Sequence, residues 1–199
     1  MTLEQYQAIL DTGQLDAIAI TDHDTIDEAQ RIQDTLGERI IVGEEITTTA
    51  GDIIGLYLHK TIPAGLSAEA AIETIQAQGG LVYIPHPFET IRSGLDEATL
   101  NSIADSVDIV ETHNGRAFAQ KRHQRAIDWS TTWQKPAAAS SDAHGIGGIG
   151  HTFTTIDASP TRDTLVELLQ RGHLTYQPPS LRSLLYPKYH TIRKKLFSL

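Results

Sequence analysis

Histidine and carboxylate residues, the side chains that bind divalent metal ions without cysteine, recur at one kind of position along this chain. They come directly after short apolar runs that are typical of buried strands. Five such places occur: Asp22-His23-Asp24 after 17–20, Glu44-Glu45 after 40–42, His86 after 81–84, Glu111, His113 and Asn114 after 108–110, and Asp142 and His144 after 137–139. Imidazole and carboxylate groups suit manganese, iron and zinc. The pattern therefore predicts a metal centre that is built from several strand ends.

Metal ions that share bridging carboxylates would supply hydrolytic chemistry. A metal-bound water has a lowered pKa and supplies hydroxide near neutral pH. Two or three cations would also neutralise the charge that develops on a phosphate ester during hydrolysis. The chain contains no cysteine, which excludes thiolate ligands, disulfides and a cysteine nucleophile.

The elements that must position these residues alternate along the chain. Helices are predicted at 3–11, 25–36, 67–78, 96–104, 117–129 and 162–171, and strands at 17–20, 40–42, 53–58, 81–84, 108–112, 137–139 and 152–156. This alternation favours parallel strands with helices outside. In a parallel α/β barrel the carboxyl ends of the strands meet at one face, where such folds place their active sites.

The composition is that of one globular domain with a basic end. The 199 residues are 40% hydrophobic and 21% charged. The net charge of -9 argues against non-specific nucleic-acid binding.

No apolar run approaches the ~20 residues of a membrane span, and 1–5 lacks signal-peptide features, so we expect a cytoplasmic protein. We expect a domain at 1–180 and a basic tail at 181–199. That tail is expected to pack or be solvated, with contact to RNA or lipid as the alternative, and its partner is unknown.

Five motifs at these strand ends occur in the order of one known family. They are Leu15 to Asp24 (LDAIAITDHD), Val42 to Thr47 (VGEEIT), Ile84-Pro85-His86-Pro87, Val110-Glu111 with Asn114-Gly115-Arg116, and Ser141-Asp142-Ala143-His144. Over residues 1 to 157 the sequence resembles the PHP (polymerase and histidinol phosphatase) family, and among its members the stand-alone phosphoesterases. The resemblance implies a distorted barrel of about seven strands and metal-dependent phosphoester hydrolysis.

The resemblance also implies roles for individual residues. The expected metal ligands are His23, Glu45, His86, Asp142, His144 and, near a position where relatives place a histidine, Asp52. Glu45 is the bridging carboxylate, with Glu44 as a weaker candidate beside it. Arg92 or Arg116 would hold the substrate phosphate, because arginine forms bidentate phosphate contacts. Glu45, His86 and Arg116 are the expected catalytic residues, with two or three ions of Mn, Fe or Zn as cofactors.

One family feature is missing from the sequence. The family opens with a strand that ends in His-x-His, and no histidine precedes His23 here. The predicted fold is therefore an α/β, distorted (β/α)7-type PHP barrel without its first strand, through a truncated gene product, a start codon placed too late, or a remnant of the full domain.

Three functions follow from this reading. The first is a phosphoesterase that hydrolyses a small phosphate monoester, such as a nucleoside phosphate or an oligonucleotide end, by metal-bound hydroxide. The alternative is an N-terminally truncated, inactive domain that binds a metal or a phosphorylated ligand. A hydrolase of C–N bonds is disfavoured, because such enzymes lack the Glu-Glu and Ile-Pro-His-Pro motifs.

The remaining histidines are expected outside the metal centre. His113 is expected to pack near the site, and His151 either faces the site or starts a strand. The others, His59, His123, His173 and His190, are expected to face solvent.

Overall fold

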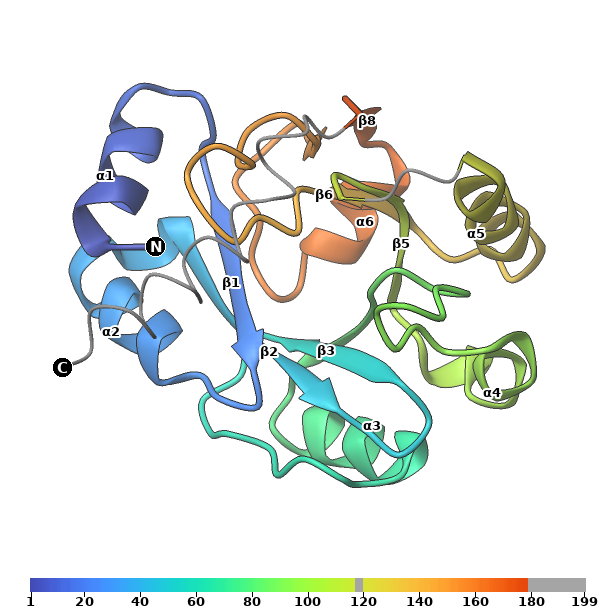
Figure 1. Cartoon of the computed structure of the whole chain (residues 1–199). Helices are drawn as coiled ribbons and strands as arrows, with labels where there is room; N and C mark the ends of the chain where they lie inside the picture. The colour runs from blue at the N-terminus through green and yellow to red at the C-terminus, as the bar shows by residue number, and fades with distance from the viewer. Residues whose placement is uncertain (117–119, 179–199) are drawn as a thin grey trace, which may run out of the picture.

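The computed structural model describes residues 1–116 and 120–178 (Figure 1). Its elements in chain order are α1 (Leu3–Asp11), β1 (Ile18–His23), α2 (Asp27–Leu36), η1 (Gly37–Arg39), β2 (Ile40–Thr47), β3 (Asp52–Leu56), α3 (Ala68–Ala77), β4 (Leu81–Ile84), α4 (Glu97–Ser102), η2 (Ala104–Ser106), β5 (Ile109–Asn114), α5 (Gln120–Thr132), β6 (Ala137–Ser140), β7 (Phe153–Thr155), α6 (Leu165–Gln170) and β8 (His173–Thr175). The predicted alternation of helices and strands is present, whereas the basic tail at 181–199 lies outside the described residues.

Six strands form one sheet in sequential order, β1 to β6, and β7 and β8 form a separate antiparallel pair. The pairs β1–β2, β4–β5 and β5–β6 are parallel. Strand β3 is antiparallel to both of its neighbours, so the expectation of a purely parallel sheet is wrong there. The cause is the tight turn after β2, in which the Thr48 amide donates to the Gly51 carbonyl at 3.2 Å. This turn returns the chain antiparallel to β2, where a parallel neighbour would need a long crossover.

Alternate residues of each strand face opposite sides of the sheet, and each side has its own core. On the outer side, Ile40, Val42 and Ile46 of β2 join a large cluster with the helices α1 to α5. On the inner side, Ile41 joins Leu165 and Leu169 of α6 in a second cluster. Figure 1 shows α6 inside the curve of the sheet and α1 to α5 around its outside.

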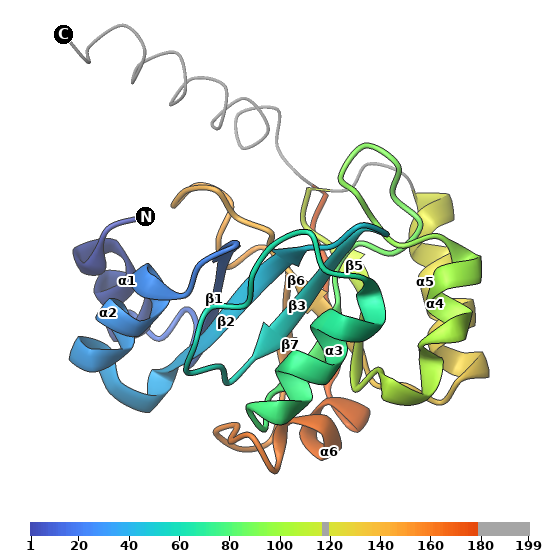
Figure 2. The same ribbon diagram turned by 90° about the horizontal axis from the view of Figure 1, so that it is seen from below.

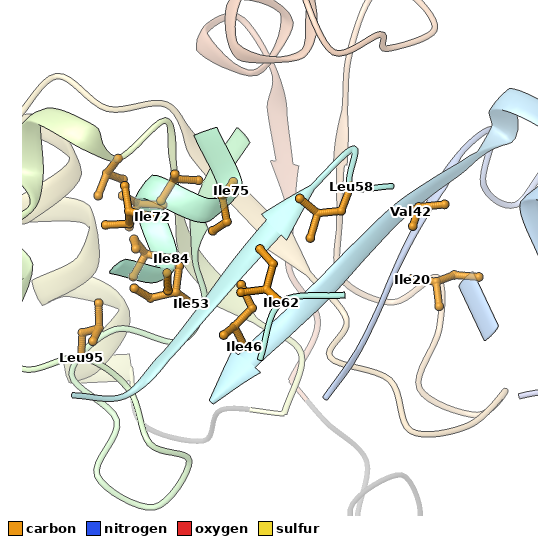
Figure 3. Close-up of a cluster of buried hydrophobic side chains, with 14 of the residues drawn as sticks. Ile20, Val42, Ile46, Ile53, Leu58, Ile62, Ile72, Ile75, Ile84 and Leu95 are labelled. Carbon is orange, nitrogen blue, oxygen red and sulfur yellow. The ribbon is translucent and has the colours of Figure 1, made fainter. Parts of the chain in front are cut away.

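Isoleucine and leucine side chains fill the space between the sheet and α3. Figure 3 shows Ile72 and Ile75 of α3 beside Ile53 of β3 and Ile84 of β4. Ser67 begins α3, since its hydroxyl accepts a hydrogen bond from the Ala70 amide at 3.2 Å. Burial of this apolar face holds the central strands in place, and with them the residues at their ends.

The curled six-stranded sheet forms a half-barrel, which confirms the expected mixed α/β, barrel-type fold (Figure 2). Strands β1 and β6 are the two edges of this sheet among the described residues. In the described parts of the chain, no helix has the length and apolar character of a membrane span.

Candidate metal centre

The side chains of His23, Asp52 and His86 meet around Glu45, near the carboxyl ends of β1, β2 and β4. Ligand atoms of His23, Glu45 and Asp52 all lie within 4.8 Å of one another. The Nε2 atom of His86 is 2.9 Å from Glu45 Oε1, and the Nε2 atom of His23 is 3.5 Å from Glu45 Oε2. Glu45 thus has one histidine at each carboxylate oxygen, which is the position expected of a bridging carboxylate.

Strand geometry explains why these residues meet. His23 and Glu45 are directly opposite in the parallel β1–β2 ladder. Asp52 is the first residue of β3, and because β3 runs antiparallel, its start lies beside Thr47 at the carboxyl end of β2. Glu45 has the same strand parity as Ile41, and Asp52 has the same parity as Ile54, so both face the inner side. The ligands therefore stand above the inner core.

Glu44 lies on the opposite side of the same strand. It is fully buried, and its Oε2 accepts a hydrogen bond from the Ile62 amide at 2.8 Å. Burial raises the pKa of its carboxyl group. The sequence named Glu44 as a weaker candidate ligand, and its outward direction removes it from the group around Glu45. Glu44 also lies in the interior of β2, because this strand extends to Thr47 and not only to Val42.

The carboxylates around Glu45 place negative charge in a partly buried site. Burial and the nearby Glu45 carboxylate raise the pKa of Asp52 to about 6. For His86, burial acts to lower the pKa, but the hydrogen bond to Glu45 and the charge of Glu111 outweigh it, and the net shift is upward. Beyond burial, the Glu45 and Glu111 carboxylates contribute to these shifts, so negative charge gathers at this place. The donor set of imidazoles and carboxylates, together with this negative charge, fits a divalent metal ion such as Mn, Fe or Zn.

A second group of side chains adjoins the first around Asp142. Arg92 Nη1 donates to Asp142 Oδ2 at 2.5 Å, and Arg116 Nη1 lies 3.3 Å from Asp142 Oδ1. His144 Nδ1 lies 3.5 Å from Asp142 Oδ1. Burial acts to raise the pKa of Asp142, but Arg116 and Arg92 outweigh it and hold the pKa below its usual value. In this structure, the positive charge beside the Asp142 carboxylate therefore comes from Arg92 and Arg116.

The two arginines differ in how firmly they are held. Arg92 also makes a bidentate pair with Glu89, at 2.8 and 2.9 Å, and donates to Asn114 Oδ1 at 2.8 Å. Arg116 contacts His144, at 3.2 Å between Nη1 and Nδ1, and its buried Nε has no hydrogen-bond partner within the described structure. Arg116 therefore retains more capacity for a phosphate than Arg92.

Glu111 connects the two groups. Its buried carboxylate accepts hydrogen bonds from the His86 amide at 2.5 Å, from Asn114 Nδ2 at 2.9 Å and from the Ser140 hydroxyl. Asn114 Nδ2 is also 3.2 Å from Asp142 Oδ2. Burial raises the pKa of Glu111. Through these contacts, Glu111 joins the ends of β4, β5 and β6 and fixes the backbone of His86.

The segment 85–95 brings His86 and Arg92 to the site. The Phe88 amide donates to Leu95 O at 3.0 Å and the Gly94 amide donates to Glu89 O at 2.7 Å. A side chain on Gly94 would overlap the carbonyl oxygen of His86, so glycine is required there. His86 and Asp142 both have positive φ, 29° and 45°. Such backbone conformations are costly for non-glycine residues and cluster at functional sites.

All eight residues predicted for the site lie in these two groups. His23, Glu45, Asp52 and His86 form the first group, and Asp142, His144, Arg92 and Arg116 form the second. From the sequence, Glu111 and Asn114 are named among the strand-end residues without an individual role for either, and Glu89 is not named. Their position after an apolar run is the signal for Glu111 and Asn114, whereas Glu89 lies in a turn, where no pattern marks it.

The remaining histidines differ in whether they are exposed or buried. His59 and His173 are exposed, as expected, and His190 lies outside the described residues. His123 is buried, which contradicts the expectation that it faces solvent, because its ring packs against His113 and Tyr176 at centroid distances of 5.3 and 4.9 Å. His113 is half-buried, and its ring packs against His123 and Tyr176. His151 is exposed and contacts Gln177 at 3.2 Å.

Comparison with solved structures identifies the class of fold. A two-domain protein from Bacteroides vulgatus, which contains a predicted PHP-like metal-dependent phosphoesterase, superposes with a TM-score of 0.69 at 18% identity, over 95% of this chain and 64% of that one. PsfC from Pseudomonas syringae gives a TM-score of 0.64 at 16% identity, over 98% of this chain and 89% of that one. A proposed metal-dependent phosphoesterase from Bifidobacterium adolescentis gives 0.58 at 17% identity, over 86% and 91%.

Sequence comparison narrows the class. Residues 120–174 match the family described as PHP-associated. Two uncharacterised proteins of Methanocaldococcus jannaschii are 39% identical over 103 residues and 34% identical over 118 residues. These matches cover 50% and 57% of this chain but only 60% and 49% of the relatives, so the chain spans about half the length of the curated relatives it matches. Residues 120–174 therefore carry a PHP-associated segment, and the chain shares its fold with structures of PHP-like proteins.

Proposed function

We propose that this protein is a metal-dependent phosphoesterase that hydrolyses a small phosphate monoester, such as a nucleoside phosphate or an oligonucleotide end. The observation that carries the proposal is the group around Glu45, in which ligand atoms of His23, Glu45 and Asp52 lie within 4.8 Å and His86 contacts Glu45. Bound divalent ions would lower the pKa of a water molecule and offset the charge of the phosphate.

In this proposal, separate residues bind the metal ions and the phosphate group. His23, Glu45, Asp52 and His86 hold the metal ions, and Asp142 and His144 complete the set when their arginine contacts open. Arg116 binds the phosphate through its guanidinium group, whose Nε has no partner within the described structure. Arg92 holds Asp142 and Asn114 in place and takes the phosphate second, because Glu89 already occupies two of its donors.

Paired variants of two adjacent glutamates test this proposal. Glu45→Gln removes the charge of the bridging carboxylate, whereas Glu44→Gln makes the same change one residue away on the other face of β2. Calorimetric titration with Mn²⁺ and hydrolysis of p-nitrophenyl phosphate are measured for each. We expect Glu45→Gln to lose both and Glu44→Gln to keep both. Equal Mn²⁺ binding by the two variants would contradict the proposal.

A second function is favoured by the contacts of Asp142. Two arginines occupy this carboxylate, at 2.5 and 3.3 Å, where the first function needs a metal ligand. If they stay there, the protein binds a metal ion at Glu45 and a phosphorylated ligand at the arginines without turnover. Mn²⁺ binding and phosphate binding with no hydrolysis of any phosphate monoester would decide for this binding module.

A further inference from the structure

A small cavity lies against His86, between β5 and α5. Its volume is about 10 Å³, close to the minimum that holds one water molecule. His86, Glu111, Thr112 and Asn114 line it on the side of the sheet, and His123 lines it from α5. The cavity therefore joins a predicted metal ligand to the helix that begins the PHP-associated segment.

Two buried imidazole nitrogens at this cavity have no hydrogen-bond partner within the described structure. They are Nδ1 of His86 and Nε2 of His123. The two side chains belong to residues that are only 7% and 8% exposed. A buried polar atom without a partner is costly, and most such atoms in folded proteins are paired with protein groups or with ordered water.

The polar side chains of Asn114 and Thr112 beside the cavity already form hydrogen bonds with other residues. Asn114 donates to Glu111 at 2.9 Å and accepts from Arg92 at 2.8 Å. The Thr112 hydroxyl is 3.0 Å from His113 Nδ1. The His123 ring is fixed by its edge-to-face contact with Tyr176, with an interplanar angle of 87°. Both histidines therefore line the cavity while these two nitrogens have no partner within the described structure.

We propose that one water molecule in this cavity joins His86 Nδ1 to His123 Nε2, and that His123 is a positioning residue for His86. Without a metal ion, His86 Nε2 donates its proton to the Glu45 carboxylate, and Nδ1 of the neutral ring accepts a hydrogen bond from the water. When Nε2 binds a metal ion instead, the neutral ring carries its proton on Nδ1. This proton is donated to the water, and the water donates to the unprotonated Nε2 of His123. A histidine ligand needs such an outer partner to fix its ring and its tautomer. The link to metal affinity rests on the proposed function.

Two substitutions of His123 separate this role from simple packing. His123→Phe keeps a ring against His113 and Tyr176 but removes the acceptor. His123→Gln loses the ring but keeps an acceptor that can reach the water. The same change at an exposed histidine, His59→Phe, is the control. Mn²⁺ affinity by calorimetry and the ¹⁵N signals of the His86 ring without metal are measured for each protein.

We expect His123→Phe to weaken Mn²⁺ binding on the order of tenfold and to shift the His86 ring signals. His123→Gln should retain more affinity than His123→Phe, and His59→Phe should match the unchanged protein. The opposite order, with His123→Phe better than His123→Gln, would assign His123 to packing and overturn the proposal. If the unchanged protein binds no Mn²⁺, the proposed function fails, while unaltered His86 signals in His123→Phe would still overturn the water link.

Discussion

Replacement of Asp52 by asparagine should stabilise the metal-free protein while it removes a metal ligand. Asp52 is only 5% exposed and lies within 4.8 Å of ligand atoms of Glu45 and His23. Burial and the Glu45 charge raise its pKa from 3.8 to about 6. At about 1.4 kcal/mol for each pKa unit, ionisation of this carboxyl group in the folded protein costs about 3 kcal/mol. Asparagine keeps the shape of the side chain and removes that cost.

The stability gained by Asp52→Asn should depend on pH, because the pKa of Asp52 differs between the folded and the unfolded protein. Between pH 3.8 and about 6 the folded protein holds a proton on Asp52 that the unfolded chain has released. Stability from this group is therefore present at low pH and is lost as the pH rises through about 6. The gain from Asp52→Asn should be about 3 kcal/mol near neutral pH and should vanish below the unfolded pKa.

Urea unfolding in the presence of a chelator, at several pH values, measures this gain. Asp34→Asn, at an exposed position on α2, is the matched control and should change little at any pH. When Mn²⁺ is added, the unchanged protein should gain stability by mass action and Asp52→Asn should gain much less. A variant that is less stable than the unchanged protein at neutral pH, or a gain that does not depend on pH, would refute the reasoning.

Two further changes test the network around the site. Glu111→Ala should destabilise the protein by about 3 kcal/mol in urea unfolding, because it strips acceptors from the His86 amide, Asn114 and Ser140; a loss below about 1 kcal/mol would show that Glu111 does not join the strands. Arg92→Met should lower the free energy of unfolding by about 3 kcal/mol, because it leaves Glu89 and Asp142 without their shared buried cation. The same change should raise Mn²⁺ affinity in calorimetry, and unchanged affinity would mean that Arg92 does not compete with the metal ion for Asp142.

The positions of the strand ends could be predicted from the sequence, because short apolar runs mark buried strands and polar residues follow them. His23, His86 and Asp142 were placed at the carboxyl ends of their strands on this ground, and the structure brings them there. The side of the sheet was harder to predict. Glu44 and Glu45 are adjacent and chemically alike, and only the exact extent of β2 decides that Glu45 faces inward.

Contacts between distant segments could not be predicted in the same way. Asp52 reaches the site because β3 runs antiparallel, which depends on the turn after β2. His123 lies in a polar stretch of α5, and its burial comes from the rings of His113 and Tyr176, which are far from it in sequence or on another element. The pairing of Arg92 with Asp142 spans 50 residues, and no local pattern encodes it.

Release of inorganic phosphate from a phosphate monoester is the most direct test of the central claim. The chain is stripped of metal with a chelator, Mn²⁺ is added back in steps, and the unchanged protein is compared with Glu45→Gln and Glu44→Gln. We expect hydrolysis that starts with added Mn²⁺ in the unchanged protein and in Glu44→Gln, with no hydrolysis by Glu45→Gln. Hydrolysis that is equal in all three proteins, or that does not depend on a divalent ion, would contradict it.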